Sequence, residues 1–125
     1  MLSDARYHTA LPCSDYERAK SFYAEKLGLT PVDEQPMGAF YEGRDGSRFL
    51  LFPSSGRASG SHTQLGLSVA DVDAEVQDLK QRGVQFEEYD FGGFDKATGI
   101  AQIGGIRGAW FKDSEGNLLG LVQLP

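Results

Sequence analysis

The chain has 125 residues and a formal net charge of −6 at pH 7, and 40% of its residues are hydrophobic. A chain of this length and composition folds as one compact domain, which we expect to span residues 1–125. The acidic balance argues against nucleic acid and anionic membranes as partners, because both bind basic faces. The single cysteine excludes an intrachain disulfide, and no apolar run approaches the ~20 residues of a membrane span. We therefore expect a cytoplasmic protein, since the first residues also lack the features of a signal peptide.

The first predicted helix covers residues 15–27 and follows a short strand. Ser14 and Glu17 have the spacing of a capping box, in which each side chain bonds the other residue's backbone amide. Gly28 supplies the left-handed backbone conformation that ends a helix. Beyond it, a turn at 44–46 separates two strand-like segments, as in a hairpin. Apolar residues recur at helical spacing on one face of the helix, namely Tyr16, Ala19, Phe22, Tyr23 and Leu27.

The second half of the chain repeats this pattern. Residues 67–73 align with 11–17, and both segments lead into a helical pattern that stops at a glycine. The second helix is predicted over 71–82 and lacks a hydroxyl cap, because alanine stands where the first helix has serine. An insert at 86–105, rich in aromatic residues, acids and glycines, precedes a closing hairpin. Such an insert suits either a flap over a binding site or a plain surface loop.

Two segments of the chain resemble the glyoxalase/bleomycin-resistance/extradiol-dioxygenase (vicinal oxygen chelate) superfamily. HTALPCSDYERAKSFYAEKLGL, beginning at His8, is similar to the opening strand and helix of its modules, and WFKDSEGNLLGLVQ, beginning at Trp110, to their closing hairpin. The resemblance implies an α+β fold of two tandem βαβββ modules, 4–55 and 61–125. These modules would form an open eight-stranded cup with the helices on its outer face. The resemblance also implies a small-molecule ligand inside the cup and a homodimer, since open sheet edges pair with a second copy.

Metal-dependent members of this superfamily hold the ion with side chains near the start of each module's first strand and on each last strand, where the ligand is usually Glu. By the same spacing, the first-strand positions of this chain are His8 and Gln64. The last-strand positions are Leu50 and Gly120, neither of which can bind a metal through its side chain. The resemblance therefore implies no metal and no other cofactor. His62, two residues before Gln64, keeps open an irregular site with His8 and one acidic loop residue.

Alternation along the predicted strands assigns the side chains that would line the cup. The set is mainly apolar and aromatic with a few polar groups, which is usual in sites for flat organic ligands. Phe111 is assigned to the core, on the other side of its strand from the cup. An arginine inside such a cup needs a carboxylate, a ligand anion or water at the rim. The predicted ligand-binding residues are His8, Phe40, Arg48, Leu50, Phe52, Gln64, Trp110 and Gly120.

Three functions fit this set of residues. The first is a metal-independent protein that binds an aromatic or hydrophobic small molecule. The second is a metal-dependent lyase, isomerase or dioxygenase of the same superfamily, with His8 and Gln64 as atypical ligands. The third is an enzyme that works without metal and uses His8 as the proton carrier. Cys13 lies beside the start of the first helix, where thiolates are favoured, but the sequence offers it no His or Asn partner for catalysis.

Overall fold

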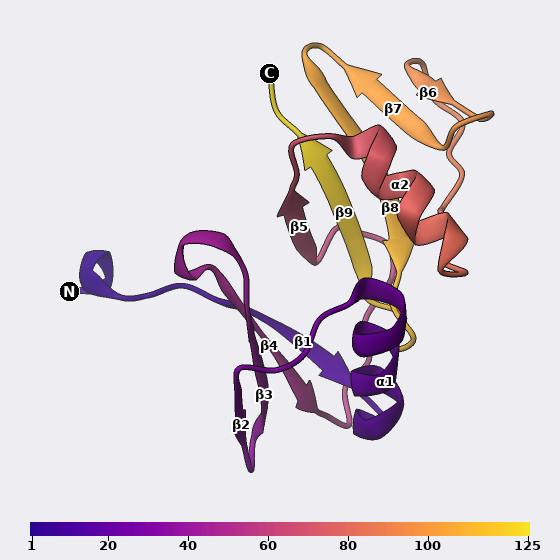
Figure 1. Cartoon of the computed structure of the whole chain (residues 1–125). Coiled ribbons are helices and arrows are strands. Elements are labelled where there is room, and N and C mark those ends of the chain that lie inside the picture. Colours follow the sequence, from indigo (N-terminus) through magenta and orange to yellow (C-terminus); the bar gives the residue numbers. More distant parts are fainter.

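The computed structural model describes all 125 residues and contains two open sheets, each with one helix packed against it (Figure 1). In the first unit (residues 2–53) the strands lie in the order β1-β4-β3-β2, with β1 parallel to β4 and the other neighbours antiparallel. This is the βαβββ order predicted for the first module. The unit contains two short 3-10 helices, Leu2–Asp4 and Arg44–Gly46, and the elements β1 Thr9–Cys13, α1 Tyr16–Leu27, β2 Asp33–Gln35, β3 Gly38–Glu42 and β4 Arg48–Pro53.

The second unit (residues 62–123, including the loop before β5) has the same order with one extra strand. Its strands lie in the order β5-β9-β8-β7-β6. The predicted α+β class with two βαβββ units is confirmed. The second sheet has five strands rather than four, because the insert contributes the two-residue strand β6 beside β7. The elements are β5 Leu65–Ser68, α2 Val72–Gln81, β6 Phe94–Asp95, β7 Ile100–Ile103, β8 Ile106–Lys112 and β9 Leu118–Gln123.

Both helices lie where the sequence predicts them, but their capping groups differ from the prediction. Asp15 is the N-cap of α1, and its carboxylate accepts a hydrogen bond from the Arg18 amide at 3.0 Å. The predicted capping box is wrong, because the amide and hydroxyl of Ser14 both donate to the carboxylate of Glu115 from the far end of the chain. Asp71 caps α2 in the same way as Asp15 caps α1, so the two helices have equivalent caps rather than unequal ones.

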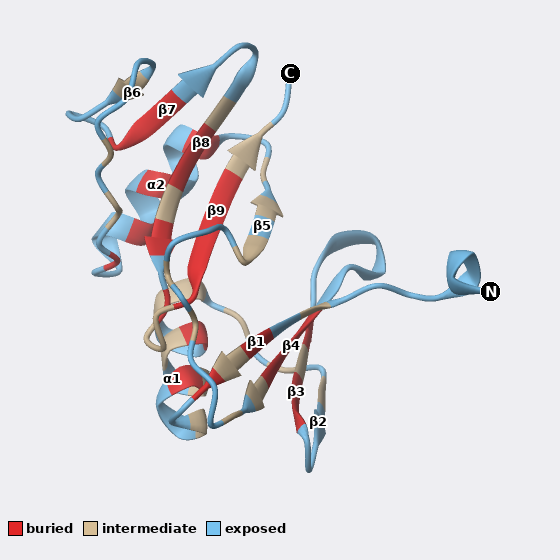
Figure 2. Cartoon of the chain, turned by 180° about the vertical axis from the view of Figure 1, so that it is seen from behind, coloured by how far each residue is buried: buried red, intermediate tan, exposed pale blue.

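The core of each unit lies between its helix and its sheet, where the buried segments gather in Figure 2. In the first unit Tyr23 of α1 packs against Tyr41 and Phe49, whose stacked rings have centroids 4.8 Å apart. In the second unit Phe111 is fully buried, while its neighbour Trp110 on β8 is half-buried. This difference follows the period-two alternation of side chains along a strand.

A polar cluster joins the two units at the turn between β8 and β9. Asp113, which is 6% exposed, accepts hydrogen bonds from the Tyr23 hydroxyl at 2.7 Å and from the Asn117 side-chain amide at 2.8 Å. The same amide donates to a backbone carbonyl of β1 at 3.0 Å. Glu115 pairs with Arg18 of α1 at 2.8 Å. These five residues, called the interunit cluster below, hold the closing turn of the second unit against the first (Figure 1).

The two sheets are separate, with β1 and β5 each at an edge of its own sheet. The face of each sheet opposite its helix has exposed residues such as Ala10 on β1 and Gly66 on β5. The N-terminal segment extends away from the body of the molecule (Figure 1), and Tyr7 on it is exposed. None of the helices has the length and apolar character needed to cross a bilayer.

Candidate functional site

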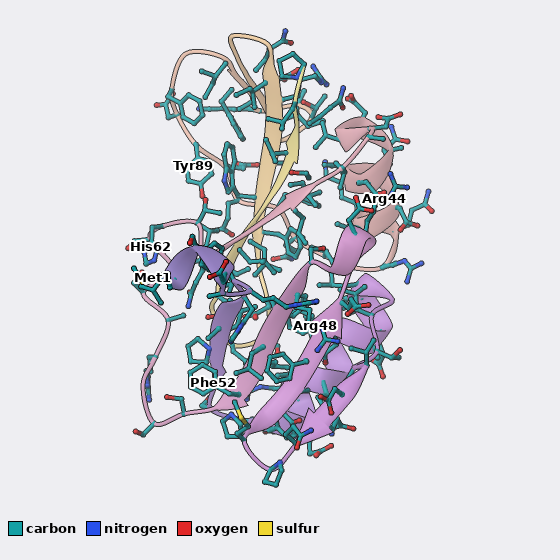
Figure 3. All side chains as sticks on the ribbon, turned by 90° about the vertical axis from the view of Figure 1, so that its left-hand side faces the viewer. Met1, Arg44, Arg48, Phe52, His62 and Tyr89 are labelled. Atoms are coloured by element: carbon teal, nitrogen blue, oxygen red, sulfur yellow. The ribbon has the colours of Figure 1, made fainter.

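The predicted ligand-binding residues divide between the two units. Figure 3 shows Arg48 and Phe52 in the first unit and Tyr89, which contacts Trp110, in the second. Neither the cavity beside His8 nor the cavity beside Trp110 holds predicted residues from both units. Within the single chain the predicted ligand-binding residues therefore form two half-sites, one on each unit. The first comprises His8, Phe40, Arg48, Leu50 and Phe52, and the second comprises Gln64, Trp110 and Gly120.

The first half-site is built on β3, β4 and the residue that precedes β1. The ring of His8 packs edge-on against Phe40, with centroids 5.4 Å apart. Phe40 lies beside the buried Leu50 in the strand register. Arg48 donates to the Glu42 carboxylate at 2.8 Å and lies 5.9 Å from the centroid of the Phe40 ring. The carboxylate partner that an arginine requires here is thus supplied by the residue opposite it on the neighbouring strand.

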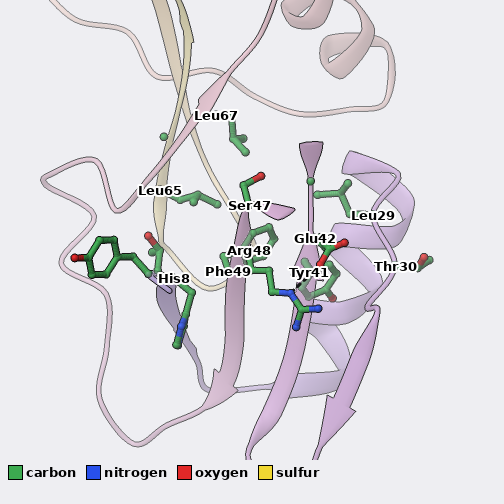
Figure 4. A pocket seen from close by; sticks show the side chains of 14 residues that line it. His8, Leu29, Thr30, Tyr41, Glu42, Ser47, Arg48, Phe49, Leu65 and Leu67 are labelled. Atoms are coloured by element: carbon green, nitrogen blue, oxygen red, sulfur yellow. Dashed lines mark hydrogen bonds and ion pairs between the residues drawn. The ribbon is translucent and has the colours of Figure 1, made fainter. Parts of the chain in front are cut away.

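A cavity of about 430 Å³ lies where the two units meet (Figure 4). The first unit contributes His8, Arg48 and Tyr41 to its lining, and β5 contributes Leu65 and Leu67. Both leucines pack against the core but are only partly buried. The cavity therefore combines apolar surface that the single chain leaves uncovered with polar groups of the first half-site.

A cavity of about 280 Å³ is lined by Trp110 and Gly120 of the second half-site but not by Gln64, and no charged side chain lines it. Trp110 lies directly opposite Gly120 in the register of β8 and β9, and its indole Nε1 donates to Thr63 Oγ1 at 3.1 Å. A Cβ atom on Gly120 would stand 3.0 Å from Nε1, and a Cβ on Gly108 would stand 3.5 Å from the far end of the indole. The indole therefore lies along the sheet above two glycines, in space that side chains would otherwise fill.

Aromatic residues of the insert extend this surface. The ring of Tyr89 is perpendicular to the Trp110 indole, with centroids 5.5 Å apart. Phe91 and Phe94 contact Tyr89 and each other at centroid distances of 5.6 to 6.2 Å. The stretch from Tyr89 to Phe94 thus packs beside the second half-site rather than standing free of it.

The residues at the metal-ligand positions do not fit a divalent metal centre. The side chains of Leu50 and Gly120 offer no donor atoms, and His8 and Gln64, neither of which is a carboxylate, lie on different units. His62 is exposed, and its ring bonds a serine hydroxyl at 3.0 Å. No three His, Cys, Asp or Glu side chains converge anywhere in the chain to hold an ion. Hard divalent ions need carboxylate charge, and the only carboxylate that lines either cavity, that of Glu42, is already paired with Arg48.

Cys13 is placed for packing rather than for nucleophilic chemistry. Its side chain is buried, and its thiol donates to the carbonyl of Phe52 at 3.3 Å. Burial raises the pKa of the Cys13 thiol to about 11, and the carboxylates of Glu115 and Asp113 add to the shift. The thiolate that the adjacent helix start would favour therefore does not form at neutral pH.

Two residues that contact Trp110, Thr63 and Tyr89, are not among the ligand-binding residues predicted from the sequence. Thr63 lies in the loop before β5, and its hydroxyl accepts from the Trp110 indole on β8. One signal in the sequence does bear on this site. The turn that follows Lys112 in the closing hairpin sets residues 110 and 120 opposite each other, so a glycine facing the tryptophan can be deduced from the spacing.

Comparisons with known proteins agree with this fold. The family model of the Glyoxalase/Bleomycin resistance protein/Dioxygenase superfamily matches residues 7–121, and the chain belongs to this superfamily. The uncharacterized protein YurT of Bacillus subtilis (strain 168) is 30% identical to it, over 92% of this chain and 95% of YurT.

Solved structures with the same fold are also similar to the chain. TnmS3, an antibiotic binding protein from Streptomyces sp. CB03234, is 26% identical with a TM-score of 0.66, over 98% of each chain. A glyoxalase/bleomycin resistance protein from Catenulispora acidiphila has a TM-score of 0.69 at 17% identity, over 98% of this chain and 100% of that one. At that identity the second likeness concerns the fold alone.

Proposed function

We propose that this protein binds an aromatic or hydrophobic small molecule without a metal ion. The observation that carries the proposal is the apolar cavity of the second half-site, in which the Trp110 indole fills the space above Gly120. The resemblance assigns Gly120 to a position where metal-dependent members usually have a carboxylate. Apolar and aromatic walls with few polar groups are typical of sites for organic ligands. The antibiotic-binding function of TnmS3, which is similar over nearly the whole chain, supports the same class.

In this proposal the ligand contacts both half-sites. His8, Arg48 and Gln64 provide its polar contacts, and Phe40, Leu50, Phe52 and Trp110 provide its apolar ones. Because one chain separates the half-sites, we propose that a homodimer brings the first half-site of one copy to the second half-site of the other. The partly exposed leucines of β5 and the unpaired edges of β1 and β5 support this assembly.

Metal independence predicts the response of the protein to divalent ions. Protein purified without chelator should hold no stoichiometric zinc, nickel, manganese or iron by elemental analysis. Adding these ions should leave its melting temperature nearly unchanged. An ion bound only to the folded state at 100 times its Kd would add about 2.7 kcal/mol, which raises the melting temperature by several degrees. One equivalent of tightly held metal that His8→Ala removes would instead favour a metal-dependent enzyme.

The homodimer predicts the sedimentation behaviour at micromolar concentration. We expect a species of twice the 13.6 kDa chain mass. The dimer would join the two half-sites and bury the exposed part of the β5 leucines. Leu67→Glu places a charge on this partly exposed surface and should shift the distribution toward the monomer. Because Leu67 also packs against the core, circular dichroism of the variant must match that of the wild type for this comparison. A monomer of 13.6 kDa for the unchanged chain would contradict the assembly but would leave the ligand class of the second half-site open to a separate test.

A further inference from the structure

The second half-site holds its only tryptophan in one fixed position. Three contacts set this position: the Thr63 hydroxyl accepts from the indole Nε1 at 3.1 Å, Gly120 lies beneath the five-membered ring, and Gly108 lies beneath the far end. The Tyr89 ring, perpendicular to the indole, borders it on another side. We call this arrangement of Trp110, Thr63, Gly120 and Gly108 the tryptophan platform.

From the tryptophan platform we infer the ligand class of the site: one flat, uncharged ring system that stacks on the indole, with Thr63 and Gly120 as the residues that position it. This inference rests on the proposed function and narrows it. The indole is half-buried and lines the cavity, so part of it is available to a ligand. Aromatic rings stack in offset arrangements, which a flat ligand can adopt on a fixed indole.

No charged side chain of the second half-site lines this cavity, so an ionic group on the ring that stacks on Trp110 would have no partner within this half-site. The only hydroxyl in the lining belongs to Thr63, which accepts from the indole N–H and carries no charge that could pair with an ionic group. A charge buried here would lose its hydration without gaining a partner, which is strongly unfavourable. A neutral flat ring loses little hydration and gains contact area.

The absence of a side chain at Gly120 matters for the tryptophan platform. A metal-ligating side chain at residue 120 would crowd the indole in its observed position. A Cβ at residue 120 would stand 3.0 Å from the indole Nε1 and 3.2 Å from the Thr63 methyl group, closer than side chains normally pack. The indole would therefore have to shift to admit a carboxylate side chain at this position. The glycine that leaves the metal position without a donor is the residue that admits the tryptophan.

Equilibrium titrations of three probes test this inference. The probes are 9-anthracenemethanol, which is flat and uncharged, anthracene-9-carboxylate, which is flat and charged, and 1-adamantanemethanol, which is compact and not flat. We expect 9-anthracenemethanol to bind best and to quench the fluorescence of Trp110, the single tryptophan of the chain. Its Kd should rise about tenfold in Thr63→Val and in Gly120→Ala, the size of a lost aromatic contact. Thr63→Ser, which keeps the hydroxyl, should restore wild-type affinity.

The unliganded variants provide a readout that does not depend on binding. In Thr63→Val the emission of Trp110 should move to longer wavelength, because the freed indole turns toward water, while Thr63→Ser should match the wild type. If 9-anthracenemethanol binds Thr63→Val and Gly120→Ala as tightly as the wild type, or if the adamantane probe binds as well as the flat one, the platform is overturned and the proposed function stands. If none of the three probes binds the wild type, both the platform inference and the proposed function are overturned.

Discussion

Replacing Asp113 by Ala should lower the free energy of unfolding by about 3 kcal/mol and the melting temperature by about 10 °C. The Asp113 carboxylate is 6% exposed and accepts from the Tyr23 hydroxyl, the Asn117 side chain and the backbone amides of residues 115 and 117. Without it, these donors stay buried and unpaired, which costs more than the net value of the bonds. Urea unfolding monitored by circular dichroism measures the difference.

Two further variants make this expectation specific. Tyr23→Phe removes one hydrogen bond to the carboxylate and should cost about 1.5 kcal/mol, as for other bonds to charged groups. Asp90→Ala is the matched control, because the Asp90 side chain is 96% exposed and should change stability by less than about 0.5 kcal/mol. Equal stabilities of Asp113→Ala and Asp90→Ala would show that the interunit cluster does not hold the two units together.

Glu115→Gln should remove part of the pH dependence of stability. The Arg18 guanidinium bonded to Glu115, together with the Asp15 amide and the Ser114 hydroxyl, lowers the pKa of this carboxyl from 4.5 to about 2. A group whose pKa is lower in the folded state stabilises the protein above its unfolded pKa. That contribution falls as the pH drops from about 5 toward 2. At pH 7 we expect it to be about 1–2 kcal/mol, less than the full shift implies, because Arg18 is half-exposed and solvent screens the pair.

Urea midpoints at pH 7, 5 and 3 test this expectation. Glu115→Gln should be less stable than the wild type at pH 7, and the difference should narrow toward pH 3. Glu17→Gln is the control, on the helix that carries Arg18. The Glu17 side chain is 82% exposed, so this variant should keep nearly the wild-type stability at every pH. A constant difference between Glu115→Gln and the wild type from pH 7 to pH 3 would mean that the charge of Glu115 has no part in joining the units.

Local features of the fold are predictable from the sequence because their causes lie within a few residues. The helix spacing that ends at Gly28, where φ is 69°, is one such pattern. The alternation that buries Phe111 and leaves Trp110 half-exposed is another. The pairing of Arg48 with Glu42 is equally local, since both flank one hairpin turn, and it could have been deduced from the register.

Contacts between distant segments are the part that the sequence does not reveal. The Glu115 carboxylate accepts hydrogen bonds from the amide and the hydroxyl of Ser14, although about a hundred residues separate them along the chain. The predicted capping box fails for this reason, since its local geometry is sound. The division of the predicted site into two half-sites has a similar origin, because strand patterns fix which face a side chain takes but not how one sheet lies against another.

The most direct test of metal-independent binding is a calorimetric titration of 9-anthracenemethanol into protein dialysed against EDTA, repeated with zinc or manganese in excess. If the apolar half-sites bind the ligand themselves, the two Kd values should agree within about twofold, because no ion takes part in the contact. Binding that disappears after chelation and returns with either ion would contradict the account. In that case His8 and Gln64 would have to hold an ion that contacts the ligand.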